Sequence, residues 1–143
     1  MQKGFTLIEI LLSVAIITLL VGLSLPVYES FVRRNDLDLT TQNIVSTLRR
    51  AQVYARSGDQ DSDWGVRVDP SSLTLFKGAT YSTRNTAFDE VVPIPASMSA
   101  SGITDMVFAE LSGAPSTTGS YTLTSTTNDV RTVTVNAKGM VNY

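Results

Sequence analysis

The chain opens with a run that is apolar on every side and then becomes amphipathic. Residues 5–25 contain one charged side chain, Glu9. As a helix rising about 1.5 Å per residue they would extend roughly 31 Å, which matches the hydrocarbon core of a bilayer. Beyond Pro26, apolar and small residues recur at steps of three and four, which places them on one helix face. They are Leu37, Thr41, Ile44, Leu48, Ala51 and Ala55.

One helix is therefore predicted to run from the apolar segment through the amphipathic one. It should end near Ser57, because Gly58 is placed to act as a left-handed C-cap. A continuous helix over residues 5–57 would be about 80 Å long, far longer than a globular domain needs. Its polar face carries charges of both signs, and we expect that face to be solvated or to lie between subunits rather than to bind phosphate. The charged residues are Arg33, Arg34, Asp36, Asp38, Arg49, Arg50 and Arg56.

After Gly58 the pattern changes to the alternation that is typical of strands. Trp64–Asp69 and Ser72–Lys77 alternate on either side of Pro70-Ser71, which predicts a hairpin. Residues 116–127 are so rich in Ser and Thr that they also indicate a mobile loop. The predicted fold class is α+β, with one long N-terminal helix packed against a small antiparallel β-sheet head. Further strands are predicted over residues 89–94, 103–109, 121–125, 130–135 and 140–142.

Composition excludes several classes of function. With 143 residues, the chain has room for one modest domain besides the apolar segment. Its net charge of −2, from 11 basic and 13 acidic residues, does not favour nucleic acid as a partner. It contains no Cys and no His, which excludes disulfides, thiol nucleophiles, thiolate or imidazole metal ligands and Ser-His catalysis. A Ser-Lys dyad is the main nucleophilic option left, and no spacing around Lys3, Lys77 or Lys138 indicates one.

Three carboxylates just after the helix form a weak calcium candidate. Asp59, Asp61 and Asp63 alternate as at the start of a calcium loop. However, Trp64 stands where such a loop needs glycine, and Pro70 stands where it needs a bidentate glutamate. We therefore expect a solvated acidic turn, and no metal or other cofactor.

Glu9 is the unusual residue of the apolar segment. A charge at the centre of a membrane helix costs roughly 2.5–3.5 kcal/mol on insertion scales, and less near the helix end. A secretory signal peptide would have a shorter apolar stretch with its cleavage site after it, whereas Gly4 precedes the stretch here. A plain signal anchor, with Glu9 as an interfacial acid, remains open. The hydroxyls of this segment are expected to bond to helix carbonyls. They belong to Thr6, Ser13, Thr18 and Ser24.

The start of the chain carries a specific motif. Residues 3–9 read KGFTLIE and are followed by the apolar helix and Pro26. This order resembles the prepilin signature of type IV pilins and type II secretion pseudopilins. The resemblance implies that a peptidase cleaves between Gly4 and Phe5 and that Phe5 is then N-methylated. It also implies a pilin-like fold and assembly into a filament, in which Glu9 pairs with the Phe5 amine of a neighbour.

The resemblance further implies how the chain is organised. Its parts would be a prepilin leader over residues 1–4, a transmembrane and filament-core helix over 5–28, the amphipathic helix half over 29–57 and a β head domain over 58–143. Before assembly the chain would cross the cytoplasmic (inner) membrane once, and afterwards it would lie in an extracellular filament or cell-surface pilus. The implied partners are copies of itself, other pilins, the prepilin peptidase, a pilus or secretion assembly platform and membrane lipid. The order of strands in the head resembles, more weakly, the H-type minor pseudopilins.

Gly22 and Pro26 form a weak point in the predicted helix. Proline removes a backbone donor and glycine lowers helix propensity, so a mild kink is one interpretation. The resemblance implies the other interpretation, loss of helix here when subunits pack in a filament.

A structural subunit of a type IV pilus-like filament, not an enzyme, is the expected function. The alternatives are a minor pseudopilin of a type II secretion system, or a minor pilin whose head binds DNA or a surface. Only Arg131 and Lys138 indicate a basic patch for DNA, so nucleic acid is not an expected partner. A membrane-tethered enzyme is the least supported class.

Overall fold

The computed structural model describes residues 4–143, except the side chains of residues 23–27 and 29. It divides into two compact units, Met1–Arg33 and Arg34–Tyr143. Helix α1 (Leu7–Ser57) begins in the first unit and ends in the second. Every strand belongs to the second unit, which is called the head below.

The end of α1 confirms the predicted C-cap. Gly58 has φ 64° and ψ 29°, the left-handed conformation that glycine adopts without steric cost. The carbonyl oxygen of Ala55 accepts hydrogen bonds from the amide of Gly58 at 3.1 Å and from that of Leu111 at 2.8 Å. The last turn of the helix is therefore capped both locally and by the loop that follows β5. A short 3-10 turn, η1 (Asp59–Asp61), leads from there to the first strand.

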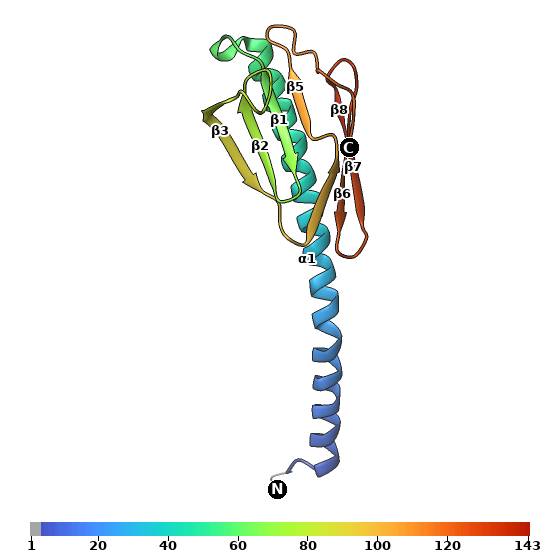
Figure 1. Cartoon of the computed structure of the whole chain (residues 1–143). Helices are drawn as coiled ribbons and strands as arrows, with labels where there is room; N and C mark the ends of the chain where they lie inside the picture. Colours follow the sequence, from blue (N-terminus) through green and yellow to red (C-terminus); the bar gives the residue numbers. More distant parts are fainter. Residues whose placement is uncertain (1–3) are drawn as a thin grey trace. The chain divides into compact units, whose positions relative to one another are not determined.

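The first sheet contains the predicted hairpin. Strands β1 (Trp64–Asp69) and β2 (Ser72–Lys77) pair antiparallel, with Asp69 opposite Ser72, so both predicted strands and their turn are confirmed. Strands β3 (Asn85–Pro93) and β5 (Asp105–Phe108) flank them in the order β3-β2-β1-β5 (Figure 1). β3 begins earlier than predicted. Its first residues are exposed at a sheet edge and show no alternation of buried residues, so the sequence pattern did not indicate them.

The head contains two sheets, whereas a single sheet was predicted. The second sheet is formed by β4 (Met98–Gly102), β6 (Gly119–Ser125), β7 (Val130–Val135) and β8 (Val141–Asn142), in the order β4-β6-β7-β8. The interpretation of residues 116–127 as a mobile loop is wrong, because β6 lies inside that range and pairs on both sides. Its threonines are β-branched and favour strands, while Tyr121 and Leu123 are fully buried.

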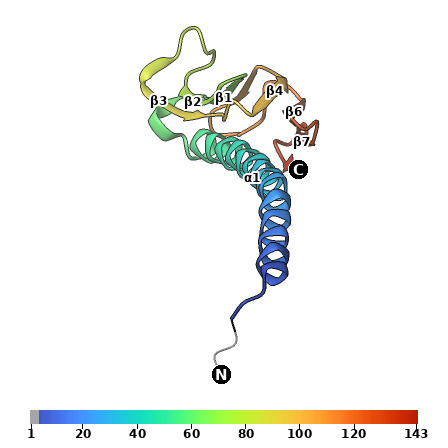
Figure 2. The same ribbon diagram turned by 90° about the horizontal axis from the view of Figure 1, so that it is seen from below.

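Both sheets pack on the amphipathic part of α1. All six residues of the predicted apolar stripe are buried, from Leu37 to Ala55. The five apolar residues among them join the inward residues of the strands in one core. Seen from below, the strands lie along one side of the helix (Figure 2). The predicted α+β fold, a long N-terminal helix packed against antiparallel sheets, is confirmed.

The charged face of α1 is less free than predicted. Arg34 lies 4.0 Å from Asp129, and Asp38 accepts a hydrogen bond from Arg131 at 2.9 Å. Arg50 donates two hydrogen bonds to the carboxylate of Glu90 on β3. These three helix residues pair with charged residues of the strands and turns of their own chain. These side chains are still 42–71% exposed, so the face is solvated as predicted, and the pairing within the chain is what the sequence did not indicate.

The Arg50–Glu90 ion pair makes the stability of the head depend on pH. Hydrogen bonds from Arg50 lower the pKa of the Glu90 carboxyl below its ordinary value of 4.5. Such a carboxyl stabilises the fold above its unfolded pKa, and the contribution is lost as pH falls through the lower folded pKa. Because both side chains are over 40% exposed, solvent limits the contribution to about 0.5–1 kcal/mol.

Replacing Glu90 with glutamine is expected to lower the free energy of unfolding at neutral pH by about 0.5–1 kcal/mol. The variant should lose less stability than the wild type when the pH is lowered from neutral to below the pKa of a free carboxyl. Thermal unfolding followed by the fluorescence of Trp64 measures both effects. Equal acid sensitivity in the two chains would show that the ion pair contributes nothing.

Candidate processing and assembly site

The predicted cleavage site lies just before α1 begins. Gly4, Phe5 and Thr6 are outside the helix, and no atom of a residue beyond its chain neighbours lies within 4 Å of the position of a Cβ on Gly4. The bond between Gly4 and Phe5 is therefore in an exposed, non-helical segment. Residues 1–3 of the predicted leader lie outside the described residues.

Thr6 is the N-cap of α1, a role that the sequence analysis missed. The amide of Glu9 donates to the backbone oxygen of Thr6 at 3.1 Å and lies 3.4 Å from its side-chain Oγ1. The amide of Ile10 also donates to the oxygen of Thr6, at 3.3 Å. A Thr followed three positions later by Glu is the sequence pattern of a capping box, so the signal was present in Thr6-Leu7-Ile8-Glu9. The cap sets where the helix starts relative to Phe5.

Glu9 occupies the first turn of the helix. A carboxylate there interacts favourably with the positive end of the helix dipole. The side chain is exposed, and within residues 4–143 no hydrogen bond or ion pair is formed by its carboxylate. Ser13 donates its hydroxyl to the backbone oxygen of Glu9 at 2.7 Å, not to the carboxylate. The acid is thus held at a defined height on the helix with its charge accessible.

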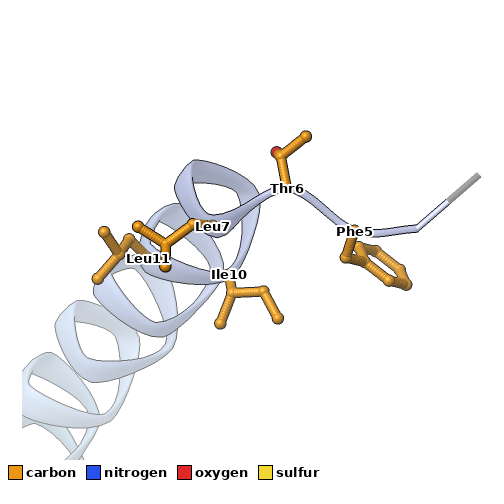
Figure 3. Close-up of a pocket in the computed structure, with 5 residues that line it drawn as sticks. All are labelled: Phe5, Thr6, Leu7, Ile10 and Leu11. Atoms are coloured by element: carbon orange, nitrogen blue, oxygen red, sulfur yellow. The ribbon is translucent and has the colours of Figure 1, made fainter.

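Large apolar side chains are exposed on every side of this segment. Phe5 is 80% exposed and Leu7 is 81% exposed, and both line a shallow hollow with Thr6, Ile10 and Leu11 (Figure 3). Such a surface is unfavourable in water and requires an apolar environment. The remaining exposed large residues of the segment are Ile8, Leu12, Val14, Ile16, Ile17, Leu19, Leu20 and Val21.

The predicted hydroxyl bonds to helix carbonyls are confirmed for Ser13 and Thr18, but the prediction is wrong for Thr6, whose Oγ1 faces the amide of Glu9 as a cap. The hydroxyl of Thr18 donates to the backbone oxygens of Val14 and Ala15 at 3.0 and 2.9 Å, and Ser13 makes the equivalent bond to Glu9. The side chain of Ser24 lies outside the described residues. Over the part of the chain whose side chains are described, no helix is both long enough and apolar enough to qualify as a membrane span.

The predicted weak point lies inside a regular helix in the single chain. α1 includes both Gly22 and Pro26, and Gly22 has open space around it. The side chain of Pro26 is outside the described residues. Loss of helix at this point in a packed filament stays a prediction.

The three carboxylates of the weak calcium candidate are not brought together. Asp63 turns toward the loop after β5, where its Oδ1 accepts a hydrogen bond from the amide of Glu110 at 2.7 Å. Asp59 contributes its backbone oxygen to Trp64, whose Nε1 donates at 3.0 Å. Among the described residues, no group of three acidic side chains is arranged to hold a metal ion. The segment is used to connect the helix end to the head.

The two basic residues considered for DNA binding have different surroundings. Arg131 donates to Asp38 at 2.9 Å, so its charge is already balanced within the chain. Lys138 is exposed beside the turn that precedes β8, and its backbone oxygen accepts from Gln52 at 3.3 Å. The two therefore do not form a shared free basic patch.

Known proteins resemble this chain in its N-terminal motif and in its sequence. A family model described as a prokaryotic N-terminal methylation motif matches residues 1–25. The type IV major fimbrial protein FimA of Dichelobacter nodosus is 27% identical over 89 residues, which cover 62% of this chain and 57% of that protein. The chain thus spans little more than half the length of this curated relative.

The fold is similar to that of a solved pseudopilin. The minor pseudopilin EpsH from the type 2 secretion system of Vibrio cholerae matches with a TM-score of 0.56 and 15% identity. The match covers 75% of this chain and 94% of that one, and at this identity it concerns the fold alone. The chain is thus similar to a methylation motif at its N-terminus, to a type IV fimbrial protein over part of its sequence and to a minor pseudopilin in its fold.

Proposed function

We propose that the chain is a structural subunit, a pilin or pseudopilin, of a type IV pilus-like filament, polymerised through its N-terminal helix. The observation that supports this most is the apolar surface exposed on every side of α1 from its first turn, directly after the processing motif. A helix of this kind is stable only among lipid tails or other apolar helices. A filament core of parallel helices provides the second environment.

The proposal begins with processing of the N-terminus. A prepilin peptidase cleaves between Gly4 and Phe5, and the new amine of Phe5 is methylated. Both atoms of the cleaved bond precede the Thr6 cap, so an enzyme can bind this segment without unwinding α1. The product carries a cation at its first residue and an anion at Glu9, one turn into an apolar helix.

Pairing of these charges between neighbours sets the register of the filament. In a water-poor core the attraction between the Glu9 carboxylate and the Phe5 amine of the next subunit is much stronger than in water. A charge left there without a partner is strongly unfavourable. Subunits therefore settle at the stagger that brings each carboxylate to an amine.

Before assembly the chain resides in the cytoplasmic (inner) membrane. Its residues 5–28 cross the membrane once, with Lys3 and the leader on the cytoplasmic side. An assembly platform then moves the subunit from lipid into the extracellular filament or cell-surface pilus, together with other pilins. The head forms the outer surface of that filament.

A minor pseudopilin of a type II secretion system is the second candidate, and the fold match supports it. A DNA-binding minor pilin is less well supported, because Arg131 is already paired with Asp38. Nothing in the proposal requires catalysis, a metal or a cofactor.

Shearing fibres from intact cells and identifying their subunits tests the proposed function. We expect this chain in the sheared fraction. A major pilus subunit would be a main component of that fraction, and a minor subunit would be present there in trace amounts. For a secretion pseudopilin we expect fibres only when the chain is overproduced. Absence from fibres under both conditions, with normal amounts in the membrane, would contradict the proposal.

A further inference from the structure

The charged residues of the head fall into two groups, those paired within the chain and those left free. Arg49 and Lys138 form no ion pair with any described residue, and neither do Glu110, Asp59 and Asp61. Arg49 and Lys138 lie beside one set of exposed apolar side chains, and Glu110, Asp59 and Asp61 lie beside another. A further free cation, Arg56, packs next to Gly113 in the loop that carries Glu110. The arginines that are paired are Arg34, Arg50, Arg67, Arg84 and Arg131.

The free anions surround one exposed leucine, and we call this surface the Leu111 knob: Glu110 and Leu111 with Asp59 and Asp61. Leu111 is 73% exposed and has φ 61°, a left-handed conformation that is uncommon for a bulky residue. Its amide is fixed to the oxygen of Ala55 at 2.8 Å, and the loop lies at the same end of the head as the end of α1 (Figure 1). The fold thus holds an apolar side chain outward among acids.

Arg49 and Lys138 flank a groove between α1 and the C-terminal strand, the α1–β8 groove. It consists of two adjoining shallow hollows that share Arg49. Lys138 lies two residues before Met140 and is exposed. The apolar side chains of the groove belong to Val45, Val53, Met140, Val141 and Tyr143, of which Val53, Met140 and Tyr143 are more than half exposed.

We propose that the Leu111 knob of one copy docks in the α1–β8 groove of a second copy. Leu111 covers Val53 and Met140, while Glu110 meets Arg49 and the η1 acids face Lys138. Both surfaces combine apolar contact with charges that are unpaired in the single chain, and the charges are opposite in sign. A second copy of this chain carries the whole complementary set.

The contact is heterologous, since knob and groove are different surfaces, and repetition of such a contact produces an open chain of subunits rather than a closed pair. This step rests on the proposed function, in which copies enter the filament from one membrane with their helices parallel. The knob lies beside Ala55 and Gly58, and Arg49 lies six to nine residues earlier on the same helix. At a rise of about 1.5 Å per residue, placing the knob of one copy beside Arg49 of a parallel copy staggers the two copies by about 9–14 Å along α1.

Paired cysteines test the contact, because the chain has no cysteine of its own. In the full chain, Leu111→Cys combined with Val53→Cys should give a ladder of covalent dimers, trimers and larger species when isolated filaments are oxidised. Leu111→Cys combined with Val91→Cys is the matched control, since Val91 is 59% exposed but lies on β3, outside the groove. The control should give no ladder.

Charge reversal tests the same contact independently. Arg49→Glu and Glu110→Arg should each reduce the ladder several-fold, and the two together should restore it. Dimers without larger species would overturn the heterologous contact. Filaments that form but give no cross-link would overturn the docking surface and leave the filament proposal intact, whereas a wild-type chain that never forms filaments would overturn both.

Discussion

Replacing Glu9 with alanine is expected to remove the chain from filaments while its insertion in the membrane stays at the wild-type level. The carboxylate is exposed in the first turn of α1, and in the proposed filament it meets the amine of a neighbour's Phe5. Without it, each amine is buried in the core with no partner, which costs about 3–5 kcal/mol per subunit. Quantifying the chain in sheared fibres and in membranes measures the two properties separately.

Two further variants separate charge from shape. Glu9→Gln keeps the size of the side chain but removes its charge, and it should fail in assembly as Glu9→Ala does. Ser13→Ala changes a polar residue one helical turn after Glu9. The Ser13 hydroxyl bonds only to the backbone oxygen of Glu9, so this variant should assemble normally. Wild-type amounts of Glu9→Ala in fibres would mean that Glu9 is not paired in the core.

The second large effect concerns the head. Leu48→Ala is expected to lower its free energy of unfolding by about 2–5 kcal/mol, because the leucine is fully buried where α1 packs on the sheets. That is a large share of the roughly 5–15 kcal/mol available to a domain. Trp64, the single tryptophan, is buried with its ring 4.9 Å from that of Tyr54, so its fluorescence reports unfolding.

Leu39→Ala is the matched control for this variant. It is the same substitution on the same helix, but Leu39 is half exposed, so the free energy of unfolding should change by less than about 0.5 kcal/mol. Urea unfolding of the full chain in detergent micelles compares the two. Equal losses would show that the apolar stripe of α1 does not form the core of the head.

Features that depend on neighbouring residues were predictable from the sequence. The end of α1 follows from Gly58, which adopts the left-handed conformation. The β1–β2 hairpin follows from Pro70-Ser71 and the alternation on either side. The motif at residues 3–9 was equally local, and the structure places its described residues, 4–9, at the start of α1. In each case a few adjacent side chains determine the backbone.

Features that depend on distant partners were not predictable in this way. β4 consists mainly of small polar residues and exists because it pairs with β6, which the Ser and Thr content had also suggested as a loop. Arg50 forms its ion pair with Glu90, which lies forty residues away in the sequence. The exposed position of Leu111 similarly results from a bond to Ala55 across the fold.

The Thr6 cap is a different case, because its signal was local and was overlooked. Thr6-Leu7-Ile8-Glu9 matches a capping box, and the same four residues are part of the N-terminal motif and include the charge of Glu9. The cap and the acid are parts of one arrangement. Thr6 starts the helix directly after Phe5, and Glu9 then lies in the first turn.

Mass spectrometry of the chain isolated from fibres or membranes decides whether Glu9 has the amine that the proposed assembly needs. We predict a polypeptide that begins at Phe5 and carries one added methyl group on its N-terminal nitrogen. A chain that still contains residues 1–4 would contradict the proposal. Glu9 would then have no Phe5 amine to pair with, and an interfacial acid on a signal anchor would be the better explanation.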